Sequence, residues 1–139
     1  KMREIKFRAC VLEDEFDNDC KFEPYMEDNV ESFTEPFEEH RKGHIILMQF
    51  IEQKDSDGNE IYEGDVVTWY NPMIETGERM IGVVVYDTKQ ATYKKCPINL
   101  YKANAGDGGY TGFEFRWYDN IKVLGNIYEN PELLQNQTK

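Results

Sequence analysis

The sequence predicts a mainly β protein with minor helix, folded as a small antiparallel roll or partly open barrel. Aromatic residues make up 14% of the chain and favour strands. Six or seven short apolar or alternating runs are separated by turn signals at intervals of roughly ten residues, a pattern typical of small barrels and rolls. A length of 139 residues fits one domain with a small appendage.

The first predicted strand covers residues 4–11. Ile5, Phe7, Ala9 and Val11 alternate with charged residues, so one face of this strand is expected to be buried and the other exposed. A short helical turn is predicted to begin near Pro36, because proline is favoured at the first position of a helix. Gly43 is expected to end this turn.

Further strands are predicted in the remainder of the chain. Their expected ranges are residues 44–51, 66–70, 81–86, 98–101 as the weakest, 113–117 and 121–128. Asp-Gly at 57–58 indicates a tight turn, and Gly82 indicates a bulge or a close backbone approach. Asn130, Pro131 and Glu132 together predict a short C-terminal helix.

Several blocks carry a family resemblance. They are Met2–Ala9 (MREIKFRA), Leu47–Phe50, Lys54-Asp55, Asp57-Gly58, Glu60–Val67 (EIYEGDVV), Gly82–Tyr86 and Leu124–Leu134 (LGNIYENPELL). Together they resemble the YopX family of phage and prophage proteins. Cys10 departs from the expected aromatic residue, and neither the acidic segment 12–41 nor residues 104–112 match a block.

The resemblance implies an SH3-like roll at residues 44–139, preceded by an N-terminal strand and acidic segment at residues 1–43. It also implies an origin in a bacteriophage or prophage, a location in the host cytoplasm, and a tendency to oligomerise. It supplies no catalytic or ligand-binding residue, so no cofactor is expected and enzymatic activity is not predicted.

The net charge of −11 comes from one segment. Residues 11–39 contain twelve acids and one base, Lys21, whereas the other 110 residues balance at fifteen acids and fifteen bases. This distribution excludes a basic protein that wraps duplex DNA, and it argues against binding to anionic membranes. The absence of a long apolar run predicts a protein outside the membrane.

Three interpretations of the acidic segment stay open: a solvated insertion, a docking surface for a host or phage protein, and a mimic of DNA that inhibits a host protein. We favour protein–protein contacts as the function, because aromatic side chains among carboxylates combine electrostatic steering with apolar anchors. The candidate contact residues are Phe16, Phe22, Tyr25 and Phe33.

A nucleic-acid-binding barrel is the alternative function. Residues 89–102 contain no acid and combine lysines with stackable rings, as single-strand grooves do. The candidate contacts are Lys89, Tyr93, Lys94, Lys95, Tyr101 and Lys102. Four lysines on an acidic protein give a modest positive field, so nucleic acid is not the partner we favour.

Other familiar sites do not fit the sequence. The positions rejected as metal, nucleophile or phosphate sites are 55–60, His40 with His44, Ser32, Ser56, Cys96 and the loop 106–109. Gly58 stands at the wrong place for a calcium loop, and Gly43 interrupts the histidine pair. Cys10, Cys20 and Cys96 are expected to be reduced thiols.

Overall fold

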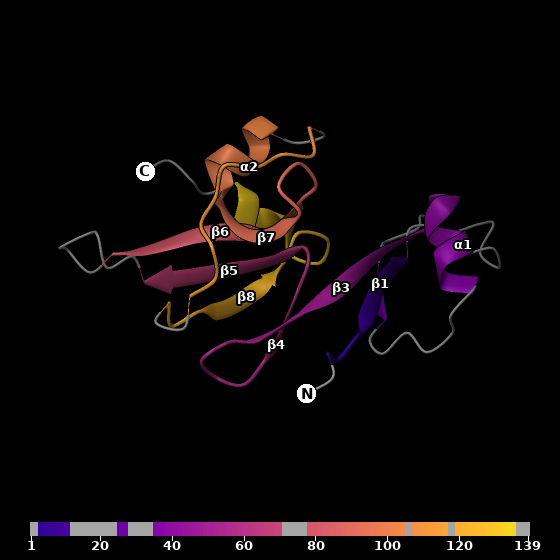
Figure 1. The fold of residues 1–139 in the computed structure, drawn as a ribbon, viewed down its shortest axis with the longest axis horizontal. Helices are drawn as coiled ribbons and strands as arrows, with labels where there is room; N and C mark the ends of the chain where they lie inside the picture. The colour runs from indigo at the N-terminus through magenta and orange to yellow at the C-terminus, as the bar shows by residue number, and fades with distance from the viewer. Residues whose placement is uncertain are drawn as a thin grey trace.

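The protein is described from a computed structural model, within which residues 3–11, 25–27, 35–70, 78–104, 107–116 and 119–135 are described. The strands are β1 (Phe7–Val11), β2 (Tyr25–Glu27), β3 (Ile45–Lys54), β4 (Glu60–Tyr62), β5 (Asp65–Tyr70), β6 (Arg79–Asp87), β7 (Thr92–Pro97) and β8 (Lys122–Asn126). The helices are α1 (Glu35–Arg41), α2 (Ile98–Asn104) and the 3₁₀ helix η1 (Pro131–Leu134). Figure 1 shows their arrangement.

The described strands form two antiparallel four-stranded sheets, in the orders β2-β1-β3-β4 and β7-β6-β5-β8. The predicted mainly β fold class with minor helix is therefore confirmed, and these two sheets stay open and do not close into a barrel. The division of the chain at residue 43 stays a prediction.

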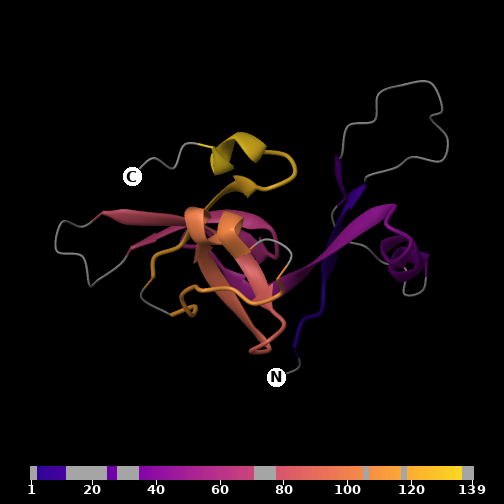
Figure 2. The same cartoon turned by 90° about the horizontal axis from the view of Figure 1, so that it is seen from above.

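The long strand β3 joins the part of the molecule that carries α1 to the part that carries the second sheet (Figure 2). Its first half pairs with β1 through Ile45–Gln49, and its second half pairs with β4 at Phe50 and Lys54. The register shifts between these two β4 contacts, where Glu52 adopts a positive φ of 64°. This irregularity bends β3, because a bulge increases local twist.

The core lies on both faces of the second sheet. One buried cluster contains Trp69, Val67 and Val84, and the other contains Val66, Val83 and Cys96. Gly82 lies where β6 passes close to β7, and an added Cβ would stand 2.4 Å from the carbonyl oxygen of Cys96. The predicted close approach at Gly82 is therefore confirmed.

Two strand predictions were wrong. Residues 98–101 begin α2, in which Ile98 and Tyr101 are spaced three apart and pack on the same core cluster. Of the predicted strand 113–117, the described residues form only a bridge between Phe113 and Lys95. Phe113 instead lies against Trp69, with 5.9 Å between ring centroids, so its ring covers the sheet.

The N-terminal predictions are confirmed in part. β1 lies within the predicted strand, but the predicted exposed face is wrong: Arg8, which pairs with Asp65, is buried, as is Cys10, whereas Ile5 is 65% exposed. α1 contains Pro36 and is followed by Gly43 with a φ of 82°. Phe37 of α1 meets Phe7 of β1 edge to face, with 5.4 Å between ring centroids. At the other end, η1 begins at Pro131 as expected.

Candidate functional site: a tyrosine-lined groove

The two lysines at the centre of the predicted basic stretch are buried. Their side chains are 10% exposed for Lys94 and 1% exposed for Lys95. Lys94 donates to Asp87 at 2.7 Å and to the carbonyl oxygen of Tyr110 at 2.8 Å. Because these contacts occupy the ammonium group, Lys94 does not present its charge to a phosphate.

Lys95 points to the opposite face of β7 and pairs with Asp119. Its ammonium nitrogen lies 5.0 Å from the centroid of the Trp69 ring and 5.6 Å from that of Phe115. Burial lowers the pKa of Lys95, whereas the hydrogen bond to Asp119 opposes that shift. Through these contacts, Lys95 holds Asp119 and Phe115 against the sheet.

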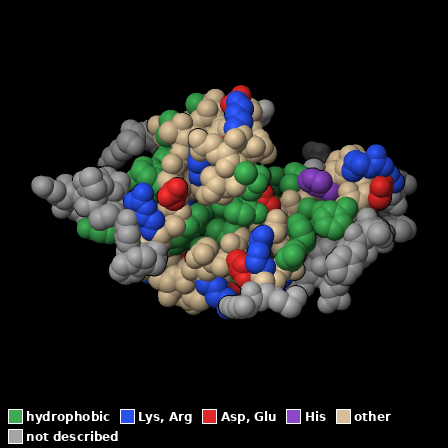
Figure 3. All heavy atoms as spheres, viewed as in Figure 1, with side chains coloured by type: hydrophobic (Ala, Val, Ile, Leu, Met, Phe, Trp, Pro, Cys, Tyr) green, Lys and Arg blue, Asp and Glu red, His purple; other side chains and the backbone are tan. Residues whose placement is uncertain are grey.

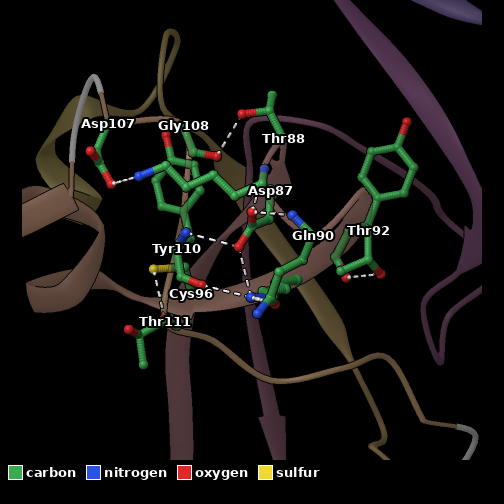
Figure 4. A network of polar contacts seen from close by, with 12 residues as sticks. Asp87, Thr88, Gln90, Thr92, Cys96, Asp107, Gly108, Tyr110 and Thr111 are labelled. Carbon is green, nitrogen blue, oxygen red and sulfur yellow. Dashed lines mark hydrogen bonds and ion pairs between the residues drawn. The ribbon is translucent and has the colours of Figure 1, made fainter.

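Asp87 organises a polar network around Lys94, seen in Figure 4. Its carboxylate accepts the backbone N–H groups of Lys89, Gln90 and Tyr110 at 2.9, 2.9 and 3.0 Å. The hydrogen bond from Lys94 is the main reason why the pKa of Asp87 lies below its usual range. The network attaches the loop containing Tyr110 to the turn between β6 and β7.

The other candidate nucleic-acid contacts are dispersed. Lys89 forms an exposed ion pair with Asp107 at 2.9 Å, and Lys102 is exposed in the last turn of α2. Tyr93 donates to the Gln49 side chain at 3.1 Å. Tyr101 stacks on Tyr110, with ring centroids 6.0 Å apart. The structure does not combine these side chains into one basic, ring-lined surface.

Of the four candidate contacts in the acidic segment, the structure describes only Tyr25. Phe16, Phe22 and Phe33 lie outside the described residues. Tyr25 is the first residue of β2 and pairs with Val11 of β1. Their role in protein contacts stays a prediction.

A groove lies between β3 and the second sheet. Its cavity is about 290 Å³ in volume, and residues of β3, β6 and α2 line it together with residues of the loops that follow β4, β6, α2 and β8. The residues that we call the tyrosine groove are Leu47, Glu63, Tyr86, Tyr101, Tyr110 and Tyr128. Figure 3 shows hydrophobic side chains at the surface where the part carrying α2 meets the part carrying α1.

The tyrosine groove continues into a second hollow of about 550 Å³. Glu63 and Tyr86 line both cavities, and Tyr93 and Gln49 line the second one. The rings of Tyr86 and Tyr93 meet edge to face, with 5.0 Å between centroids. The two hollows therefore share part of their lining, and Arg3 and Glu52 also line the second one.

Within the described residues, Ile45–Gln49 of β3 have a strand partner on one side only, β1. Two side chains protect the other edge. The Leu47 N–H donates to Nδ1 of His40 at 3.1 Å, and the Gln49 N–H donates to Oε1 of Glu63 at 2.7 Å. Because these donors are already occupied, recognition in the groove depends on side chains more than on addition of a strand.

Glu63 is the charged group shared by the two hollows. Burial raises its pKa, and this effect outweighs the opposing contributions of the Gln49 N–H and His40. Among the described residues, no Lys or Arg forms an ion pair with Glu63. Its carboxylate is therefore partly desolvated and has no ion pair with a described Lys or Arg, and His40 opposes the rise of its pKa only in part.

Burial makes three tyrosines of the groove harder to ionise. Burial raises the pKa of Tyr128 to about 12 and also raises the pKa of Tyr101 and Tyr110. Burial raises the pKa of Tyr93 to about 12, and the negative charge of Glu63 adds to this rise. The groove thus offers phenol rings and hydroxyl groups beside one carboxylate.

The sequence did not predict this groove, since its tyrosines lie on four separate stretches of chain. Among the described residues, no cluster of His, Cys, Asp or Glu is arranged to hold a metal ion. No helix of the described part is long and apolar enough to cross a membrane.

The fold and groove define a small two-sheet β protein with a surface cleft. The sequence profile described as YopX protein matches residues 4–135, so the chain belongs to the YopX family. No curated protein matches the sequence. The crystal structure of protein EF1440 from Enterococcus faecalis is similar, with 24% identity, a TM-score of 0.46, and coverage of 94% of this chain and 98% of that one.

Proposed function

We propose that this YopX-family protein is a non-enzymatic accessory protein of a phage or prophage that acts in the host cytoplasm by binding another protein. The tyrosine groove is the observation that carries the proposal. Tyrosines combine a large apolar ring with a hydroxyl group and are enriched at binding hot spots. Membership of the YopX family supports the proposed phage origin and host-cytoplasmic location, because the family is one of phage and prophage proteins.

The groove takes an extended segment of the partner. Its two hollows meet at Glu63 and Tyr86, and the protected edge of β3 forms one wall. Rings from separate elements give such a segment several shallow contacts, which suits recognition of side chains along an extended chain. Homo-oligomerisation remains a second proposal, which light scattering after gel filtration would test.

A selection from a random-peptide library tests this function. Tyr86 and Tyr70 are each 38% exposed, but only Tyr86 lines the groove, so Tyr70→Ala is a matched control for Tyr86→Ala. We expect the original protein and the Tyr70→Ala variant to enrich the same peptides, and the Tyr86→Ala variant to lose them. Circular dichroism would confirm that both variants remain folded.

Equal enrichment on all three proteins would place binding outside the groove. A complete lack of enriched peptides on the original protein would contradict the proposed function itself.

A further inference from the structure

Glu63 is a half-buried carboxylate that differs from three buried aspartates of the described chain in what surrounds it. Asp65, Asp87 and Asp119 each have a cation within their own fold, supplied by Arg8, Lys94 and Lys95 respectively. A fourth buried aspartate, Asp55, also has no ion pair among the described residues, but backbone N–H groups and the Asn59 amide surround it. Glu63 receives a backbone N–H from Gln49 and no ion pair from a described residue. A partly buried carboxylate is costly without a countercharge.

The nearby histidine does not form an ion pair with Glu63. Nδ1 of His40 instead accepts the Leu47 N–H at 3.1 Å, and His40 acts on Glu63 only at longer range. Glu63 lines both hollows, and Arg3 and Glu52 also line the second one.

The rings around Glu63 also favour a cation. Tyr86 lines both hollows with Glu63, Tyr128 lines the first and Tyr93 the second. The faces of aromatic rings attract ammonium and guanidinium groups, and the attraction strengthens when water is excluded. A carboxylate among neutral tyrosines combines direct charge pairing with this weaker attraction.

We propose that the tyrosine groove binds a segment of a partner protein that carries a lysine or arginine, whose cation pairs with Glu63 and lies against the tyrosine rings. This inference rests on the proposed function and names the chemistry of its ligand. The net charge of −11 draws cationic segments toward the protein, whereas Glu63 fixes where one cation is held.

The test compares a random dodecapeptide library selected on the original protein and on the Glu63→Gln variant. Glutamine keeps a side-chain oxygen that accepts the Gln49 N–H, so the variant removes the charge with little change in shape. We expect the original protein to enrich peptides with lysine or arginine at a fixed position, and the variant to lose that preference.

Titration calorimetry then uses the most enriched lysine or arginine peptide and a copy with norleucine at that position. Norleucine should weaken binding to the original protein about tenfold, as expected for loss of a desolvated cation contact. It should have little effect on the Glu63→Gln variant. Glu114→Gln, an exposed change outside the groove, should retain the full tenfold effect.

Three outcomes would overturn the inference. Enrichment of neutral or acidic peptides, or an equal norleucine effect on both proteins, refutes the cation contact but leaves the proposed function intact. If the original protein is a dimer and the Glu63→Gln variant is a monomer, the groove binds a second copy of this chain. A lack of any enriched peptide removes the proposed function and this inference together.

Discussion

The second sheet and the tyrosine groove differ in whether their buried charged side chains form ion pairs. On the second sheet, Lys94 and Lys95 point to opposite faces of β7, and each meets a carboxylate. In the groove, Glu63 has a raised pKa and no ion pair with a described residue. Among these described residues, the charges that fix loops are paired, whereas Glu63, which lines two hollows, has no ion pair.

This difference separates structural charges from candidate functional ones. A buried ion pair is costly to break but adds little net stability compared with apolar packing, so its presence says little about function. An unpaired and partly buried carboxylate lowers stability unless a ligand compensates for it.

The largest effect is expected from Lys95→Met, which removes the cation and leaves the Asp119 carboxylate buried. Breaking a buried pair in this way should lower the free energy of unfolding by about 3–5 kcal/mol. Urea denaturation followed by tryptophan fluorescence would measure the change. A decrease of less than about 1 kcal/mol in the free energy of unfolding would show that Lys95 does not hold Asp119 and Phe115 against the sheet.

Gly82→Ala should also destabilise the second sheet. The new Cβ would meet the Cys96 carbonyl oxygen at 2.4 Å and the Trp69 ring at 2.9 Å, so the strands would have to separate. Overpacking of this kind costs about 1–3 kcal/mol. Unchanged urea denaturation would contradict the close approach of β6 and β7.

Glu63→Gln is expected to change stability in a direction that depends on pH. A raised folded pKa means that the folded protein holds its proton more tightly than the unfolded chain. The original protein therefore loses stability relative to the variant as pH rises from about 4.5 through the folded pKa. Tyr93 and Tyr128, with pKa values raised to about 12, stay neutral in this range.

Denaturation of both proteins at several pH values from about 4.5 to 7.5 would measure this difference. If the original protein instead gained stability relative to the variant with rising pH, Glu63 would have a cationic partner in the fold.

The smallest effect is expected from Lys89→Met, which is the matched control for Lys95→Met. The Lys89–Asp107 pair is exposed, with side chains 59% and 58% accessible. Its loss should change the free energy of unfolding by about 0–1 kcal/mol. A loss comparable to that of Lys95→Met would remove the distinction between exposed and buried pairs.

Local patterns predicted most of the fold. Alternation located β1, the Asp-Gly turn followed β3, and Pro131 marked the C-terminal helix. The failure at residues 98–101 arose because Ile98 and Tyr101 also fit helical spacing, and a short apolar run does not distinguish the two. Phe113 and Phe115 alternate as a strand would, yet they cover a buried lysine.

The candidate site was much less predictable. Lys94 and Lys95 resembled surface charges because their partners, Asp87 and Asp119, lie 7 and 24 residues away. Nothing in the neighbourhood of Glu63 along the chain indicates Tyr86 or Tyr128. Such sites depend on contacts between distant segments, which charge and periodicity do not encode.

The most direct test of the central claim is a nuclear magnetic resonance titration of the ¹⁵N-labelled protein with the enriched lysine or arginine peptide. The amide of Gln49 is the natural reporter, because it donates to Glu63 at 2.7 Å. We expect large shift changes at Gln49, Tyr86 and Tyr128, which disappear in the Glu63→Gln variant. Changes confined to residues 55–59 or to the acidic segment, with Gln49 unmoved, would contradict it.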